Sequence, residues 1–356
     1  MNKFKLFSAA LVSLAIAGTT KAQFDYIKPD DMDELHNRTL IVIVEAPADP
    51  VIEKLGKKKK SDKADAYKNA VDGFNKNFAA AVAKYWKITE SEIQYKTLDE
   101  VNDITDKKNY CVMFCRSAKQ ADLSTSYKAN HGLWWWPDFK EVAHDKDFSD
   151  KMTVLGVALL DKFDKSAPFY QFTIPDLFPS KADLDYALNA ANAYIMYRVN
   201  HRKDNPKKLD EQMLKENQQT LKDKTLLIRR DWLDKRLTPA EILKVYPYPY
   251  MIAGPDTVAR IIDSADAKYA VAIVAPYDLG AAPSGGLQYV QFAYNLEDGA
   301  YLASSGFPDM PSNPKATAST ANANKPLITK KTLLDFVMYL ESDDDSGGKG
   351  KKKGKR

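Results

Sequence analysis

Apolar and polar positions follow one pattern at two places that lie far apart in the chain. Residues 35–42 read LHNRTLIV, and residues 221–228 read LKDKTLLI. In both, a Leu precedes a polar turn with a basic residue, and Thr-Leu then opens an apolar, β-favouring run. Nearly continuous apolar runs are typical of strands that are buried on both faces. The echo therefore predicts an α/β unit that occurs twice, each copy opening with such a strand.

The first unit continues with alternating helix and strand patterns. Its clearest helix covers residues 64–86, where Tyr67, Val71, Phe74 and Phe78 recur at steps of three and four. Residues 23–34, before the first strand, are polar and acidic and are expected to run over the surface. The other expected elements are strands at 38–45, 93–98, 110–114, 152–160 and 169–174, the last two paired, and helices at 98–104 and 183–199.

The second unit repeats this order of elements. Thr238, Pro239 and Glu241 form the pattern of a capping box, which predicts a helix from there to about Val245. Glu297-Asp298-Gly299 is typical of a hairpin turn between strands 288–295 and 300–304. The remaining expected elements are strands at 225–228, 250–253 and 269–275, and helices at 256–264 and 332–339.

The shared order predicts an α/β fold of two similar units, each a mixed sheet flanked by helices, related by internal duplication; α+β is the alternative class. Both apolar strands that follow the short helix begin with Tyr, at Tyr110 and Tyr269. The predicted divisions are 1–22 signal peptide, 23–204 first unit with an aromatic insertion at 118–150, 205–222 connector helix, 223–341 second unit, and 342–356 disordered acidic-then-basic tail.

The amino-terminal residues predict export. Lys3 and Lys5 precede an apolar run at 6–17, which is shorter than the roughly 20 residues that span a bilayer. Thr20 and Ala22 supply small residues before a cleavage site at Gln23, as in a secretory signal peptide. No later apolar run is long enough to cross a membrane. The mature chain is expected in the periplasm or outside the cell, with outer-membrane association as a further option.

Charge is concentrated at the two ends. The chain carries +4 overall, with three Lys in residues 1–22 and six basic residues in 346–356, so residues 23–345 carry −5. A uniformly basic surface for specific nucleic-acid binding is therefore not predicted. The tail can attract an anionic surface through Lys351, Lys352 and Lys353.

The motif search finds no standard catalytic pattern, phosphate-binding loop, metal signature or cofactor signature. Ser284 follows a proline in a glycine-containing loop and is interpreted as a turn residue. His144, Asp145 and Asp147 are interpreted as a solvated polar loop. Cys111 and Cys115 lie four apart in an expected strand, which puts their Cα atoms roughly 13 Å apart, too far for a disulfide. Either both are core thiols, or Cys115 lies beyond a turn.

Trp134, Trp135 and Trp136 are the one exception in this search. Three consecutive side chains of an extended segment cannot all face one core. Aromatic rings that point outward suit sugar rings, membrane interfaces or protein partners. The alternative is that the insertion folds over the first unit and packs these rings as a satellite core.

The closing pattern of the second half resembles a known class of module. A short helix, an Asp-containing helix, an apolar strand and a strand–Asp-Gly–strand hairpin are similar to the α/β modules of TolB-amino-terminal and CsgG-like envelope proteins. The layout is also similar to that of uncharacterised exported bacterial proteins with two such units. The resemblance covers residues 221–340 and, more weakly, 35–200. It implies an assembly or scaffold role in the envelope without catalytic residues, although the Cys that carries their lipid anchor is missing here.

Three functional hypotheses follow. The first is an exported, non-enzymatic envelope scaffold or binding module, which meets an envelope protein or a glycan. The second is a glycan- or anionic-surface-binding protein that uses Trp134–Trp136 and Lys351–Lys353. The third is an unrecognised hydrolase, which would need Ser284 or Cys115 beside a His within about 3.5 Å.

The second hypothesis predicts that two separate changes each abolish binding. Replacing Trp134, Trp135 and Trp136 by Ala should remove binding to a glycan array, and deleting residues 346–356 should remove binding to anionic lipid. The tail-dependent binding should also weaken steeply as salt is raised. Binding that survives both changes would contradict this hypothesis.

Overall fold

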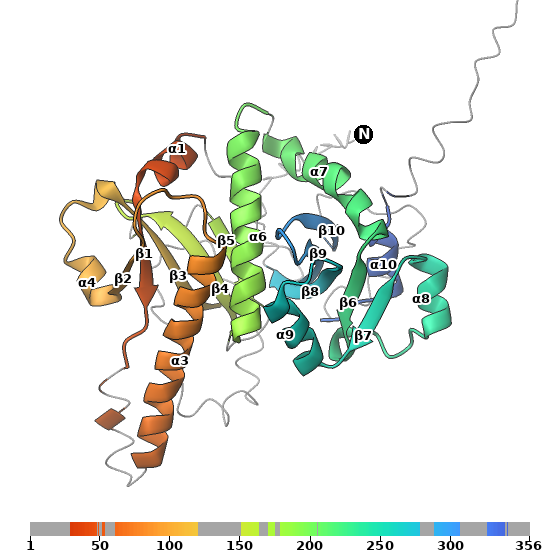
Figure 1. Cartoon of the computed structure of the whole chain (residues 1–356), viewed down its shortest axis with the longest axis horizontal. Coiled ribbons are helices and arrows are strands. Elements are labelled where there is room, and N and C mark those ends of the chain that lie inside the picture. The colour runs from red at the N-terminus through yellow and green to blue at the C-terminus, as the bar shows by residue number, and fades with distance from the viewer. Residues whose placement is uncertain are drawn as a thin grey trace, which may run out of the picture.

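The fold is taken from a computed structural model that describes residues 29–47, 49, 52–53, 61–119, 151–163, 170–174, 179–204, 206–277, 288–306, 326–338 and 340. It contains two five-stranded mixed sheets flanked by helices (Figure 1). The predicted α/β class with two similar units is therefore confirmed. No helix of the described part is long and apolar enough to cross a membrane.

The first sheet has the strand order β2-β1-β3-β4-β5. Strand β1 lies parallel to β2 and β3, and β4 is antiparallel to β3 and β5. The parallel strands are joined through helices, as a parallel connection requires. The strands are β1 (Thr39–Val44), β2 (Gln94–Thr97), β3 (Tyr110–Lys119), β4 (Lys151–Leu159) and β5 (Tyr170–Ile174), and the helices are α1 (Pro29–Asn37), α3 (Ser61–Tyr85), α4 (Leu98–Asn102) and α6 (Lys181–Asn200), with a 3₁₀ turn at Lys107–Asn109.

The second sheet, read from its other edge, has the corresponding order β7-β6-β8-β9-β10. Strand β6 is parallel to β7 and β8, and β9 is antiparallel to β8 and β10. The strands are β6 (Thr225–Arg229), β7 (Tyr250–Ala253), β8 (Tyr269–Tyr277), β9 (Gln288–Asn295) and β10 (Tyr301–Ser305), and the helices are α7 (Pro206–Asn217), α8 (Pro239–Val245), α9 (Pro255–Ser264) and α10 (Lys330–Phe336), with 3₁₀ turns at Gln218–Lys222 and Arg230–Trp232.

The two units agree in register as well as in order. Thr39 lies opposite Tyr110 in the first sheet, and Thr225 lies opposite Tyr269 in the second. The repeated Thr-Leu and the repeated Tyr are therefore partners on adjacent strands. An internal duplication predicts this agreement, because a register shift of one residue would turn each strand's buried face outward.

Helix α1 corrects one expectation. Residues 23–34 were expected to run over the surface, but Pro29–Asn37 is helical and buries Met32 and Leu35. Only two apolar residues lie on the buried face of this helix, and two positions are too few to show a helical periodicity in the sequence. Pro29 at the first turn, followed by Asp30 and Asp31, is nevertheless a helix-start signal.

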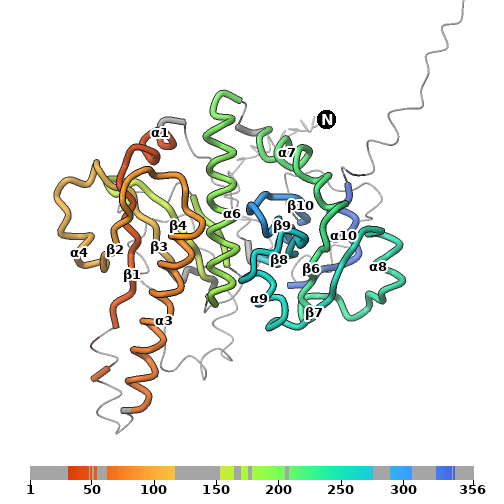
Figure 2. The backbone as a smooth tube through the Cα atoms, in the orientation of Figure 1, coloured from red at the N-terminus to blue at the C-terminus, as the bar shows by residue number. Residues whose placement is uncertain are grey.

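Helix α6 lies between the two sheets (Figure 1) and is buried on nearly every side. It packs against α3 and β5 of the first unit and against α9 and β10 of the second. Apolar residues are distributed around the whole helix and do not form one face, which is typical of a helix enclosed by protein. Ser180 caps its first turn in a capping box with Asp183. The chain then turns and runs through α7 towards β6 (Figure 2).

Polar groups at both ends of α6 fix its neighbours. Near its start, Lys181 donates to Asp185 of the same helix at 2.8 Å and to Asp263 of α9 at 3.1 Å. Burial disfavours the charge on Lys181, but these two carboxylates outweigh it and raise the pKa of the ammonium. Near its end, the buried Arg198 contacts Asp210 of α7 at 3.1 Å. The Lys181–Asp263 and Arg198–Asp210 pairs join the two units, because each connects α6 to a helix of the second unit.

The centre of the interface is aromatic. Phe172 of β5 lies 5.8 Å from Tyr294 of β9, ring centroid to ring centroid, and 6.0 Å from Tyr186 of α6. Aromatic pairs at such distances add to the hydrophobic stabilisation from burial. One continuous cluster of buried residues draws on both units, while Ile41, Val112 and Phe114 belong to a separate cluster of the first unit. The predicted domain limits stay predictions, because the shared cluster contains residues of both units and does not mark a boundary between them.

The fold predicts a marked sensitivity at Gly299, in the β9–β10 hairpin. Its φ is +73°, and a Cβ there would lie 2.3 Å from the backbone oxygen of Asn189 in α6. Gly299→Ala should lower the free energy of unfolding by about 2–4 kcal/mol, because backbone strain and the clash add. Urea unfolding of the mature chain measures this change.

Gly73, in the interior of α3, is the matched control. A Cβ at Gly73 would meet nothing within 4 Å, so Gly73→Ala should raise stability by about 0.5–1 kcal/mol. Equal effects of the two substitutions would contradict the close approach of the hairpin to α6.

Candidate functional site

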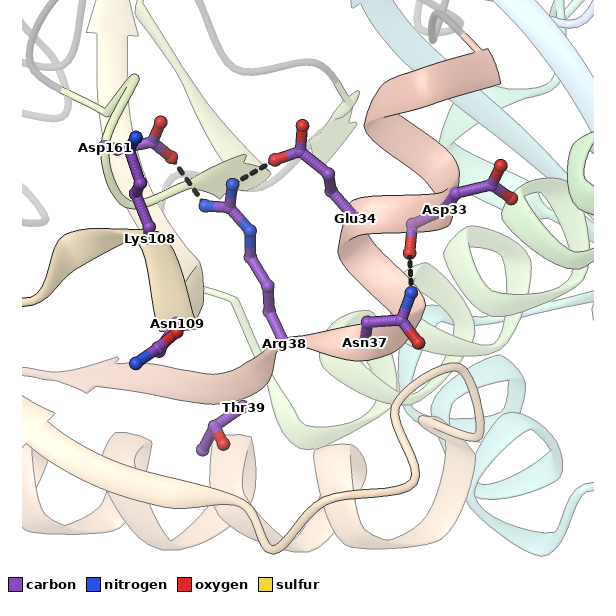
Figure 3. Close-up of a pocket in the computed structure, with 8 residues that line it drawn as sticks. All are labelled: Asp33, Glu34, Asn37, Arg38, Thr39, Lys108, Asn109 and Asp161. Carbon is purple, nitrogen blue, oxygen red and sulfur yellow. Dashed lines mark hydrogen bonds and ion pairs between the residues drawn. The ribbon is translucent and has the colours of Figure 1, made fainter.

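A buried arginine lies across the amino-terminal ends of β1 and β3. Arg38 directly precedes β1 and is 7% exposed. Its guanidinium donates to the backbone oxygen of Tyr110 at 3.3 Å and to Asp161 at 2.5 Å, and it also pairs with Glu34 of α1 (Figure 3). Charge-assisted hydrogen bonds of this kind are among the stronger ones in proteins. Arg38 thus joins α1, β3 and the turn after β4.

The second unit has the same arrangement with the homologous side chains. Lys224 directly precedes β6, and its ammonium contacts the backbone oxygen of Ala267 and the carboxylate of Glu297, the latter at 2.9 Å. We call the pairs Arg38–Asp161 and Lys224–Glu297 the basic clasps.

The two acids of the clasps occupy equivalent positions. Leu159 lies opposite Cys111 and Asn295 opposite Ala270, and each acid follows two residues later. Between strand end and acid, the backbone N–H groups of Leu160 and Leu296 donate to the carbonyls of Tyr110 and Tyr269. The clasp is therefore a feature of the repeated unit.

Arg38 determines the ionisation of its partner. Partial burial opposes the charge of Asp161, but the hydrogen bond and charge of Arg38 outweigh it and lower the pKa of that carboxyl. The next residue, Lys162, has its pKa raised mainly by a hydrogen bond to Asp31 of α1 at 2.7 Å. Helix α1 is thus held to the first unit by two neighbouring ion pairs, Glu34–Arg38 and Asp31–Lys162.

A polar cavity of about 800 Å³ opens beside the first clasp (Figure 3). Its size is in the range of small-molecule sites. Among the described residues, no three His, Cys, Asp or Glu side chains come together in a way that could hold a metal ion. The cavity is lined by Asp33, Glu34, Asn37, Arg38, Thr39, Lys108, Asn109 and Asp161.

The residues predicted from the sequence to bind ligands lie elsewhere in the chain. The tryptophan segment and the lysine tail fall outside the described residues, as do the signal peptide, the serine loop and the histidine loop, so what the sequence indicates for them stays a prediction. The residues concerned are Trp134, Trp135, Trp136, Lys351, Lys352, Lys353, Ser284, His144, Asp145 and Asp147.

Both cysteines are core thiols, which decides between the two alternatives for them. Cys111 and Cys115 are buried, are not joined in a disulfide and lie on the same face of β3. Burial raises the pKa of Cys111 to about 12 and that of Cys115 well above its usual value, where the nearby Glu45 adds to the effect. A cysteine nucleophile needs a lowered pKa. The environment of Cys115 therefore argues against its use in the hydrolase hypothesis.

Comparison with known protein families, with curated proteins and with solved structures finds no match to this chain. The resemblance to TolB-amino-terminal and CsgG-like modules accordingly stays a prediction.

The cavity could not be found from the sequence. Arg38, one of its two basic residues, stands in the repeated octapeptide, and that repeat indicates a contact that occurs twice. Its partner Asp161 stands 123 residues further along the chain, and the sheet register alone brings the two together.

The clasps predict a loss of stability in each unit. Arg38→Met should lower the free energy of unfolding by about 1–3 kcal/mol, since it leaves the largely buried Asp161 carboxylate without its cation. Lys224→Met should lower it by about 1 kcal/mol, because the Glu297 side chain is 57% exposed and solvent replaces part of the pairing. Lys235 is exposed and has no described contact, so Lys235→Met should change it by less than about 0.5 kcal/mol. Urea unfolding measures all three, and a neutral Lys224→Met would contradict a repeated clasp.

The effect of Arg38→Met should also depend on pH. Because Arg38 lowers the pKa of Asp161 in the folded chain, its stabilisation is complete above the usual aspartate pKa of about 3.9 and lost as pH falls through the lower folded value. Unfolding curves at several pH values should show that the difference in free energy of unfolding between wild type and Arg38→Met becomes smaller in acid. A difference that does not change with pH would contradict this pairing.

Proposed function

We propose that this chain is an exported, non-enzymatic cell-envelope protein that acts as a scaffold or binding module. The observation that supports it most directly is the shared core, in which two units of matching strand order are packed on one helix, α6. Such a body holds two related surfaces at a fixed separation. A protein that keeps partners in a defined arrangement needs this property more than it needs a reactive group.

Rigidity of the interface favours this role over one that requires the units to move. The contacts across α6 include ion pairs to α9 and α7, an aromatic centre, and a hairpin glycine against the helix backbone. Small displacements would break several of these contacts together. Export is the second part of the proposal and rests on the signal-peptide pattern of residues 1–22.

Export is tested with the full chain carrying a carboxy-terminal tag in a bacterial host. The expected product is an envelope or extracellular protein whose first residue is Gln23, identified by intact mass and amino-terminal sequencing. Leu11→Arg, within the apolar run, should instead leave the uncleaved precursor in the cytoplasm. Wild-type protein that keeps Met1 and stays in the cytoplasm would contradict export.

The scaffold role is tested by photo-cross-linking in the intact envelope. Tyr95 of β2 and Leu243 of α8 are large apolar side chains, 42% and 54% exposed, one on each unit. A photoreactive residue at each should give an adduct with an envelope protein or glycan, whereas one at Lys235 should not. The scaffold role fails if neither position gives an adduct beyond the Lys235 control.

A further inference from the structure

The cavity beside the first clasp carries more charged groups than the clasp itself requires. The second unit provides the comparison, because its clasp functions with Lys224, Glu297 and a backbone carbonyl. By contiguous alignment of the repeated strands, Glu34 corresponds to Thr220 and Lys108 to Ala267. Neither Glu34 nor Lys108 has an ionisable counterpart. They are therefore surplus to the structural role of the clasp.

Most hydrogen-bond donors of the cavity lining are already used. Arg38 donates to Tyr110, Asp161 and Glu34. The side-chain amide of Asn37 donates to the backbone oxygen of Asp33, and that of Asn109 donates to Asp106. Lys108 is the exception, since its ammonium has no partner among the described residues.

Acceptor atoms, in contrast, remain available to a ligand. Arg38 uses Oε2 of Glu34 and Oδ1 of Asp161, which leaves Oε1 of Glu34 without a described donor, whereas the Asp161 carboxylate also accepts a backbone hydrogen bond. The side-chain amide oxygens of Asn37 and Asn109 have no described donor either. The cavity thus presents several acceptors and one strong donor, and a complementary ligand must offer several donors and at least one acceptor.

The balance of charge decides which ligand class satisfies this pattern. Within the cavity, the two positive charges of Arg38 and Lys108 balance the two negative charges of Glu34 and Asp161. The remaining acid, Asp33, is paired outside the cavity with Arg202 at 2.8 Å. An anion would lie beside the two carboxylates, and a cation would lie beside Lys108, which is exposed. A ligand with a net charge of either sign would therefore meet a like charge in this set, which has no net charge of its own. A neutral hydroxyl group donates and accepts at once and meets neither penalty.

We propose that this cavity binds a neutral polyhydroxylated ligand, of the size of one or two sugar rings, with Lys108 and Glu34 as its binding residues. The ring hydroxyls donate to Oε1 of Glu34 and to the side-chain amide oxygens of Asn37 and Asn109, and one ring oxygen accepts from Lys108. This binding goes beyond the scaffold role, and either proposal can fail without the other.

The test uses the mature chain and three sugars of the same ring size that differ in charge. Isothermal titration calorimetry in mildly acidic buffer compares glucose, which is neutral, with glucosamine, a cation, and glucuronate, an anion. Glucose should bind saturably and more tightly than both charged sugars. No saturable glucose binding, or tighter binding of either charged sugar, would overturn the proposal.

Two substitutions locate the binding. Lys108→Ala and Glu34→Gln should each weaken glucose binding about tenfold, the loss expected for one hydrogen bond to a charged group. Lys235→Ala should leave it unchanged. Lys108 has no described contact, so Lys108→Ala tests the site without disturbing the clasp, and circular dichroism confirms the fold of each variant. Glucose binding that is unaffected by Lys108→Ala would also overturn the proposal.

Discussion

Burial of α6 between two sheets is the constraint on which the rest of the structure depends. The helix covers one face of the first sheet with α3 and at the same time packs against α9 and β10 of the second unit. Each large apolar side chain that it buries contributes about 1.5–3 kcal/mol, and this gain is shared by both units. Its polar residues need partners in the interior, because an unpaired buried charge is costly. Asp185 forms an ion pair with Lys181, and Arg198 forms one with Asp210.

The basic clasps show that the repeat preserves a chemical contact while its side chains change. Arginine in one unit corresponds to lysine in the other, and aspartate corresponds to glutamate. In both units the contact closes the same corner, where two parallel strands begin and an antiparallel strand ends. Comparison of the units therefore separates what the fold needs from what one unit adds, and that difference directs attention to Glu34 and Lys108.

Much of the fold could be predicted from particular local patterns. The Thr-Leu echo and the two tyrosines predicted equivalent strands, and these proved to be hydrogen-bonded neighbours. The capping box at Thr238 and the turn at Gly299 predicted a helix start and a hairpin, and both are present. Helix α1 was missed because only Met32 and Leu35 form its apolar face. The candidate site was missed too, since Asn37, Arg38 and Thr39 stand in the repeated octapeptide but the other lining residues are scattered along the chain.

The sequence by itself determined the elements, their order and the equivalence of the two units, because helix caps, turns and apolar periodicity act over a few residues. Tertiary structure decided how α6 serves both units, since a helix without one apolar face does not reveal its neighbours. It also decided that Arg38 meets Asp161 and that both border a cavity. That contact spans 123 residues, and the physical link between its ends is the hydrogen-bonded register of β3 with β1 and β4, which no local pattern specifies.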